Sequence, residues 1–344
     1  VMRGGRLRLA PGSADARRGR PIAMRSGDVF LAGLDWTMPE EIALSPYIKG
    51  MRRKGVRVHA VVHDLIPLQV PHTCSELALN VFPKWMELVR GFDGAVCVSQ
   101  TTASALSAWL KTHRPKRRSF PVTWFHPGAD ICIDMESSSL PDDADTILAR
   151  ISGGLSLLVV GTLEPRKRHR QILDAFEILW NEGMEITLVI VGEPGWGVDD
   201  LSKRLETHSE AGHRLLWLRH VGDSYLQCLN IASAACLCAS EAEGYGLPVA
   251  EAARWGKPLI LRDLPVFREI VGPRAFYFSG MNAESLADAL RKWSRLFLAG
   301  DAPSSKGVVT HDWASSARML MNALGLGDRT RRRTVKKSPR RGMA

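Results

Sequence analysis

The stretch Glu243-Gly-Tyr-Gly-Leu-Pro-Val-Ala-Glu251 sets two carboxylates eight positions apart across a Gly-rich turn. The run before it, Ala234-Ala-Cys-Leu-Cys-Ala-Ser240, is short and apolar and ends in a polar turn, which predicts a buried strand of a parallel sheet. The turn then lies at the carboxyl end of a strand and opens a helix. Ligands of open α/β sheets bind at such ends. The stretch therefore predicts an α/β fold with a binding site at this turn.

The chemistry of the turn favours a nucleotide diphosphate sugar. The backbone N–H groups of Gly246 and Leu247 would face an anion at the positive end of the following helix. Two acids beside a phosphate make poor phosphate ligands, so Glu243 and Glu251 are better suited to accept hydrogen bonds from hydroxyls, one on a sugar and one on a ribose.

This pattern resembles the E-x7-E signature of the retaining glycosyltransferases of family 4. The family's GT-B architecture has two Rossmann-like domains whose parallel sheets face an interdomain cleft. The resemblance extends over roughly residues 56 to 315 and is carried by further motifs in the family's order: His63-Asp-Leu-Ile-Pro67, Val98-Ser-Gln-Thr101, His126-Pro-Gly-Ala-Asp130, Val159-Val-Gly-Thr-Leu-Glu-Pro-Arg-Lys167, Val189-Ile-Val-Gly-Glu-Pro-Gly-Trp-Gly197, Gly256-Lys-Pro-Leu-Ile260 and Leu264-Pro-Val-Phe-Arg-Glu-Ile270.

The resemblance implies separate jobs for the residues of the site. Glu243 would lie near the donor sugar and its developing oxocarbenium charge, and Glu251 would bind the ribose. His63 would contact the sugar or the acceptor. Asp64 either orients His63 or caps its own loop, and both interpretations stay open.

The donor diphosphate would be bound by the strand-turn-helix that begins at Gly161. Many family members carry an Arg directly after this Gly, where this chain has Thr162. Arg166 is then the expected substitute, and Lys167 matches the family's Lys. Both cations could neutralise the leaving group as the glycosidic bond breaks. Trp196 could pack near the nucleotide base or simply against the protein.

The implied activity is transfer of a hexose, with retention, to a glycan or lipid-linked acceptor. The motifs look most like mannosyltransferases of bacterial polysaccharide and O-antigen assembly, which makes GDP-mannose the expected donor. No other cofactor and no metal is expected. Asp143-Ala-Asp145 spells a D-x-D motif but falls in a polar stretch rather than at a strand end. The alternative is a non-catalytic nucleotide-sugar binding or scaffold subunit, because the family's Gly-rich acceptor loop cannot be found and the first domain looks truncated.

The domain plan follows from composition and periodicity. We expect a disordered basic N-terminus over 1–25, an acceptor-side domain over 26–130, a linker over 131–152, a donor-binding domain over 153–327 and a disordered basic tail over 328–344. Strands are expected at about 28–32, 56–62, 94–98 and 121–125 in the first domain. In the second they are expected at about 155–161, 186–192, 215–221, 234–239 and 258–262, alternating with helices as in a doubly wound sheet. Two helices, at about 282–299 and 312–324, are expected to close the fold.

The net charge of +10 is concentrated at the two ends. Residues 1–25 carry +6 and residues 329–344 carry +8, so the body is slightly acidic at −4, which argues against a nucleic-acid partner. The tail could be passive or could contact anionic lipid. The six cysteines have no metal-ligand spacing and are expected to be reduced in a cytoplasmic protein, with any membrane contact peripheral to the inner face of the cytoplasmic membrane.

Overall fold

The computed structural model describes residues 23–32, 45–116, 118–130 and 140–327. The expected N-terminal disorder falls almost entirely outside these ranges, and the expected disorder over 328–344 does so completely. Residues 131–139 of the expected linker and Cys132 also lie outside them. The other five cysteines are free thiols, three of them within strands.

The first lobe is a parallel sheet of four strands in the order β1-β2-β3-β4. Its strands are short apolar runs, and β3 is buried along its whole length, as expected for a parallel sheet with helices on its faces. The elements are β1 (Val29–Ala32), α1 (Ser45–Arg53), β2 (Arg57–Val62), α2 (Ile66–Gln69), the short 3₁₀ turn η2 (Pro71–Thr73), α3 (Glu76–Val89), β3 (Gly94–Cys97), α4 (Gln100–Thr112) and β4 (Val122–Trp124).

The second lobe is a parallel sheet of six strands in the order β10-β9-β8-β5-β6-β7. Its elements are α5 (Ala144–Ser152), β5 (Leu155–Val160), the 3₁₀ turn η3 (Pro165–Lys167), α6 (His169–Asn181), β6 (Ile186–Val191), α7 (Asp199–Thr207), β7 (Leu215–Leu218), α8 (Asp223–Ala232), β8 (Ala235–Cys238), α9 (Leu247–Arg254), β9 (Leu259–Arg262), α10 (Pro265–Val271), β10 (Phe276–Phe278) and α11 (Ala283–Ala299).

The structure adds one strand to the five expected in this sheet. Strand β10 is three residues long and pairs with β9 at the edge. So short a run carries no alternation that periodicity could detect. The expected linker is also partly structured, because its last residues form α5, which packs against α8 in the second lobe.

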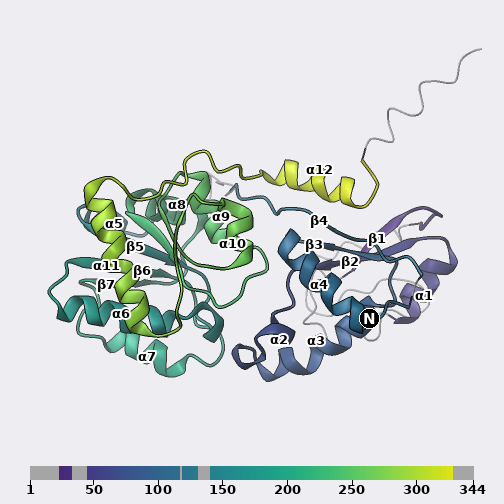
Figure 1. Cartoon of the computed structure of the whole chain (residues 1–344), viewed down its shortest axis with the longest axis horizontal. Coiled ribbons are helices and arrows are strands. Elements are labelled where there is room, and N and C mark those ends of the chain that lie inside the picture. The colour runs from purple at the N-terminus through teal and green to yellow at the C-terminus, as the bar shows by residue number, and fades with distance from the viewer. Residues whose placement is uncertain (1–22, 33–44, 117, 131–139, 328–344) are drawn as a thin grey trace, which may run out of the picture.

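The last helix, α12 (Trp313–Ala323), returns to the first lobe (Figure 1). It packs against β4, and Leu320 and Ala323 join a buried cluster with Val96 and Val98 of the first lobe. The return segment is tied down by Ala129 N–H, which donates to the carbonyl of His311 at 2.8 Å. The residues expected as one domain over 153–327 thus contribute their final helix to the opposite sheet.

None of the helices in the described ranges is both long and apolar enough to span a bilayer. The core of the second lobe lies mainly between its sheet and α6 and α11, and the core of the first lobe lies between its sheet and α3 and α4. The two sheets therefore each have their own core, and the lobes are in contact through residues that follow β2, β3 and β8: His63, Ser99 and Gly244.

Candidate functional site

The candidate site lies where the strand order of the second sheet reverses. β5 is flanked by β6 on one side and by β8 on the other, although β8 comes three strands later in the chain. The connections that leave β5 and β8 therefore diverge to opposite sides and open a crevice between them. Such a switch point is where doubly wound sheets bind their ligands. Arg166 and Lys167 follow β5, and Glu243 follows β8.

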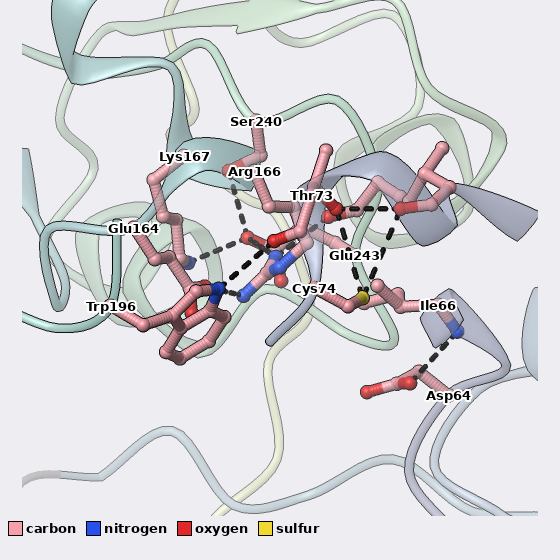
Figure 2. A network of polar contacts seen from close by, with 12 residues as sticks. Asp64, Ile66, Thr73, Cys74, Glu164, Arg166, Lys167, Trp196, Ser240 and Glu243 are labelled. Atoms are coloured by element: carbon pink, nitrogen blue, oxygen red, sulfur yellow. Dashed lines mark hydrogen bonds and ion pairs between the residues drawn. The ribbon is translucent and has the colours of Figure 1, made fainter. Parts of the chain in front are cut away.

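Glu243 is the centre of a buried ion cluster (Figure 2). Its Oε1 atom lies 2.6 Å from Lys167 Nζ and 2.9 Å from Arg166 Nη1, and it accepts a hydrogen bond of 2.8 Å from the Ser240 hydroxyl. Burial raises the pKa of Glu243, but Lys167 and Arg166 outweigh it and leave the pKa below its ordinary value. The carboxylate is therefore ionised at neutral pH.

Arg166 is shared between several acceptors. It donates to the carbonyl of Ala242 at 2.7 Å and is paired with Glu164 as well as with Glu243. Burial raises the pKa of Glu164, although Arg166 and Lys167 act in the opposite direction. Two cations and two carboxylates thus neutralise one another in this cluster, and an incoming dianion can exchange for the carboxylates.

The turn after Glu243 ends at the start of α9, as the sequence predicts. Gly246 has a φ of +90°, and a Cβ placed on it would lie 2.7 Å from the ring of Phe267, so both the conformation and the space require glycine. No side chain caps α9, and within the described ranges the N–H groups of Gly246 and Leu247 donate to no acceptor. Two free amides at a helix N-terminus form an anion-binding site.

Glu251 lies apart from the ion cluster. It is half-buried on α9 and makes no hydrogen bond or ion pair with any described residue. Burial, and then the nearby Asp223 at the start of α8, raise the pKa of its carboxyl group. Its oxygens are therefore available to hydroxyl donors, while Glu243 is held by cations.

Gly161 and Thr162 directly follow β5, beside the cluster. Gly161 donates to the carbonyl of Val191 at 2.9 Å and lies against the Lys167 side chain, with a φ of +139°. Thr162 is exposed and makes no bond to the other predicted site residues. The structure thus brings Gly161, Arg166, Lys167 and Glu243 together, whereas Thr162 is exposed at the edge of this cluster.

The first lobe contributes the end of β2. The His63 side chain is exposed and makes no hydrogen bond with the described residues, but its backbone abuts the Glu243 loop. A Cβ on Gly244 would lie 2.0 Å from the carbonyl oxygen of His63, so only glycine permits this approach. Asp64 accepts a 2.9 Å hydrogen bond from the N–H of Ile66, which makes it a cap of its own loop.

Several polar residues near the site escaped the sequence interpretation. Ser240 and Glu164 lie within the quoted motifs and bond to residues close in sequence, Glu243 and Arg166, but the motifs assign no role to either of them. Glu241 pairs with Arg168 in its own lobe and lies 2.9 Å from His72 of the first lobe. No sequence signal connects His72 to Glu241, because their contact exists only when the two lobes meet.

The aromatic residue Trp196 makes a further contact between the lobes. Its indole N–H donates to the carbonyl of Thr73 at 3.1 Å (Figure 2). Trp196 thus contacts the first lobe, and its packing near the nucleotide base stays a prediction.

Arg262 holds the end of β8 in place through hydrogen bonds to its backbone. It is buried on β9, and its Nε donates to the carbonyls of Ala239 and Ser240 at 3.0 and 3.1 Å. It also donates to Gln171 Oε1 at 2.6 Å. These bonds fix the end of β8, from which the Glu243 loop departs.

The D-x-D motif is remote from this cluster. Asp143 occupies the N-cap position of α5 and Asp145 its first turn. Across the described part of the chain, no group of three or more His, Cys, Asp or Glu side chains could hold a metal ion.

Residues 146–296 match the family model "Glycosyl transferases group 1". This segment belongs to that family. It contains η3, the Glu243 loop and α9, so the resemblance expected from the sequence motifs is confirmed for the lobe that carries the ion cluster.

Curated relatives extend the likeness of this chain beyond the matched segment. It is 38% identical over 308 residues to the "Serotype-specific mannosyltransferase WbdA" of Escherichia coli, an alignment that covers 88% of this chain and 38% of the relative. It is also 34% identical over 119 residues to the "O-antigen chain mannosyltransferase B" of E. coli, covering 33% of this chain and 30% of that protein. The chain thus spans well under half the length of these relatives.

Solved structures share the fold of both lobes. Anabaena HepE in complex with UDP-glucose matches with a TM-score of 0.64 at 18% identity, covering 87% of this chain and 78% of that one. Sucrose-phosphate synthase from Thermosynechococcus elongatus matches with a TM-score of 0.60 at 17% identity, covering 80% and 69%. The expected GT-B architecture is confirmed.

Proposed function

We propose that this chain is a retaining glycosyltransferase that transfers a hexose from a nucleotide diphosphate sugar to a glycan or lipid-linked acceptor. One observation carries the proposal. The buried Glu243, held by Arg166 and Lys167, lies in the loop that leads to two free amides at the switch point of the sheet. Cations and amides suit a diphosphate, and a carboxylate beside them suits the positive charge of a departing sugar.

The donor would replace the internal ion pairs with contacts of its own. Its diphosphate would form ion pairs with Arg166 and Lys167 and accept hydrogen bonds from the amides of Gly246 and Leu247. Glu243 would then be released from the two cations and could face the sugar. Glu251 would accept hydrogen bonds from the ribose, and His63 would approach the sugar or acceptor from the first lobe.

The transfer step needs no protein nucleophile. The C1–O bond to the diphosphate breaks as the acceptor oxygen bonds to C1 on the same face, and the leaving diphosphate oxygen takes the acceptor's proton. The two cations stabilise the charge on the leaving group, and the Glu243 carboxylate stabilises the charge on the ring.

Mannose is the favoured sugar and GDP-mannose the favoured donor. The support is the resemblance of the motifs and the names of two relatives, both of which are called mannosyltransferases. The similar structure of Anabaena HepE contains UDP-glucose, so UDP-glucose is the alternative donor to compare with GDP-mannose in a test.

The test is incubation of the purified chain with GDP-mannose or UDP-glucose and a mannose-terminated acceptor, with NMR of the product. We expect mannosyl transfer with the anomeric configuration of the donor retained. Tight donor binding without turnover would instead identify a binding subunit, and an inverted product would overturn the retaining mechanism.

Catalysis is expected to be independent of divalent metal. The basic side chains and the start of α9 would serve the diphosphate in place of Mg²⁺. We predict that transfer rates with excess EDTA and with added Mg²⁺ agree within about twofold, since losing one needed metal contact would cost far more. A rate that EDTA abolishes and Mg²⁺ restores would refute this prediction.

A peripheral contact with an anionic membrane is proposed for the basic segment 329–341. Each basic residue near such a surface contributes about 1 kcal/mol. Co-sedimentation with vesicles that contain anionic lipid, compared between the full chain and a chain ending at residue 328, tests this. Equal binding by both chains would assign the segment a passive role.

A further inference from the structure

The first turn of α4, in the first lobe, is bonded to the Glu243 loop of the second lobe. The hydroxyls of Ser99 and Thr102 donate to the carbonyl oxygen of Gly244 at 2.6 and 3.1 Å. Ser99 is fully buried and Thr102 nearly so. The carbonyl of Gly244, the residue after Glu243, is therefore held by two side chains that belong to the opposite lobe.

A second set of hydrogen bonds joins the same turn of α4 to Glu269 of α10. Glu269 accepts the N–H groups of Gln100 and Thr101 at 2.7 and 2.8 Å and the Thr101 hydroxyl at 2.7 Å. Its Oε1 also lies 2.8 Å from Nε2 of His126. All four partner groups belong to the first lobe, whereas Glu269 belongs to the second.

These contacts have a clear electrostatic basis. The first N–H groups of a helix have no acceptor within it, and a carboxylate placed there interacts favourably with the helix dipole. Burial raises the pKa of Glu269, but hydrogen bonds from His126, Thr101 and the amide of Gln100 lower it to about 2. Glu269 is therefore a charged cap supplied to α4 by the other lobe.

Tyr245 connects the two sets of bonds. It follows Gly244 in the loop, is buried, and its ring centroid lies 5.2 Å from that of His126. The loop from Glu243 to Tyr245 thus contacts both sets of residues. Gly244 accepts hydrogen bonds from the hydroxyls at the start of α4, and Tyr245 lies beside His126, which is bonded to Glu269.

We propose that Glu269, Ser99 and Thr102 form an interdomain latch that positions the Glu243 carboxylate for sugar transfer. These are positioning residues that act through the Gly244 peptide. The latch forms only when the lobes meet, so closure of the cleft and placement of Glu243 are a single event. Separation exposes each bonded group to water, which takes over the hydrogen bonds and makes closure reversible. This inference rests on the proposed function.

The test uses Glu269→Gln, which keeps the shape of the side chain but removes its charge, and Thr102→Val, which removes the hydroxyl at constant volume. Asp263→Asn is the matched control, because Asp263 is bonded to Arg268 at 2.8 Å within the second lobe beside the same helix. Transfer kcat, the Kd for donor alone, and amide hydrogen exchange of the peptide that begins α4 are measured for each.

We expect kcat to fall about tenfold or more in both latch variants while the donor Kd stays within about twofold, because the proposed diphosphate and ribose contacts come from the second lobe. The double variant should lose little more than either single one, since both act through the same peptide. Amides at the start of α4 should exchange faster in Glu269→Gln than in wild type or Asp263→Asn.

A wild-type kcat in either latch variant, or unchanged exchange at the start of α4 in Glu269→Gln, would overturn the latch. A donor Kd that weakens as much as kcat falls would also overturn it, because the residues would then support donor binding itself. If the wild-type chain transfers no sugar, the proposed function fails, and hydrogen exchange alone then decides whether Glu269 joins the lobes.

Discussion

The two carboxylates that flank the Gly-rich turn lie in different electrostatic surroundings. Glu243 is clamped by two cations and a hydroxyl, and its pKa is lowered. Glu251 has no partner among the described residues, and burial raises its pKa. The motif treats them as a pair, but their environments differ, which supports the proposed division between charge stabilisation and hydrogen bonding.

Single substitutions should separate these roles. Glu243→Gln should lower kcat by about 100-fold, because it removes the charge that stabilises the departing sugar. It should leave donor affinity intact or raise it, since it removes a competitor for Arg166 and Lys167. The measurement is transfer kinetics together with calorimetric donor binding.

Glu251→Gln should act the other way. The change replaces the carboxylate with a neutral amide and so weakens the hydrogen bonds proposed from the ribose hydroxyls. The donor Kd should rise by about tenfold, while kcat at saturation changes little. Equal losses of kcat and affinity in both variants would contradict this division of labour.

At the scale of elements, the decisive feature is the close approach of the β8–α9 loop to the end of β2. The site needs glycine at two positions of this loop for different reasons. Gly246 provides a left-handed residue before α9, and Gly244 permits contact with the backbone of His63. The Glu243 loop is therefore shaped as much by the first lobe as by the sheet that carries it.

Gly244→Ala should disrupt the closed arrangement. The new Cβ would lie 2.0 Å from the His63 carbonyl oxygen, so the two lobes must move apart. We expect transfer to fall by about 100-fold or more, given how steeply rates depend on the placement of reacting groups. Gly154→Ala is the control, because nothing lies within 4 Å of its Cβ and it should keep wild-type activity. Full activity of Gly244→Ala would show that this contact is not needed.

At the scale of the whole molecule, several sets of contacts among the described residues join the lobes. They include the return of α12 to β4, the bonds of Glu269 to α4, the bonds of α4 to Gly244, and the contacts of η2 with Trp196 and Glu241. The return of α12 combines apolar packing with hydrogen bonds, such as the one that the Trp313 N–H donates to Asp130 at 2.7 Å, and the other contacts are polar. The lobes are therefore joined by apolar packing and by hydrogen bonds together.

The charged cap at Glu269 predicts a pH dependence of stability. Its folded pKa of about 2 lies below the ordinary 4.5, so its contribution is complete above about pH 4.5 and is lost as the pH falls toward 2. Its size is on the order of 3 kcal/mol. The stability difference between wild type and Glu269→Gln, followed by denaturant unfolding, should therefore be largest near neutral pH and shrink below pH 4.5. A difference that stays constant from pH 7 to 3 would refute this.

The sequence by itself determined the alternation of strands and helices, the parallel sheets and the family of the donor-side lobe. These follow from local signals: apolar runs, turn residues and motif spacing. It also identified Arg166, Lys167 and Glu243, which the structure brings together at the switch point.

Only the tertiary structure decided the rest. The three-residue β10, the return of α12 to the first lobe, and the pairing of Glu269 with α4 carry no sequence signal. Each depends on contacts between residues far apart in the chain, as Glu269 and Thr101 are, whereas sequence patterns report only on neighbours within a few turns or strands. The physical reason is that local periodicity sets which face of an element is buried, but packing between the lobes selects the partner it is buried against.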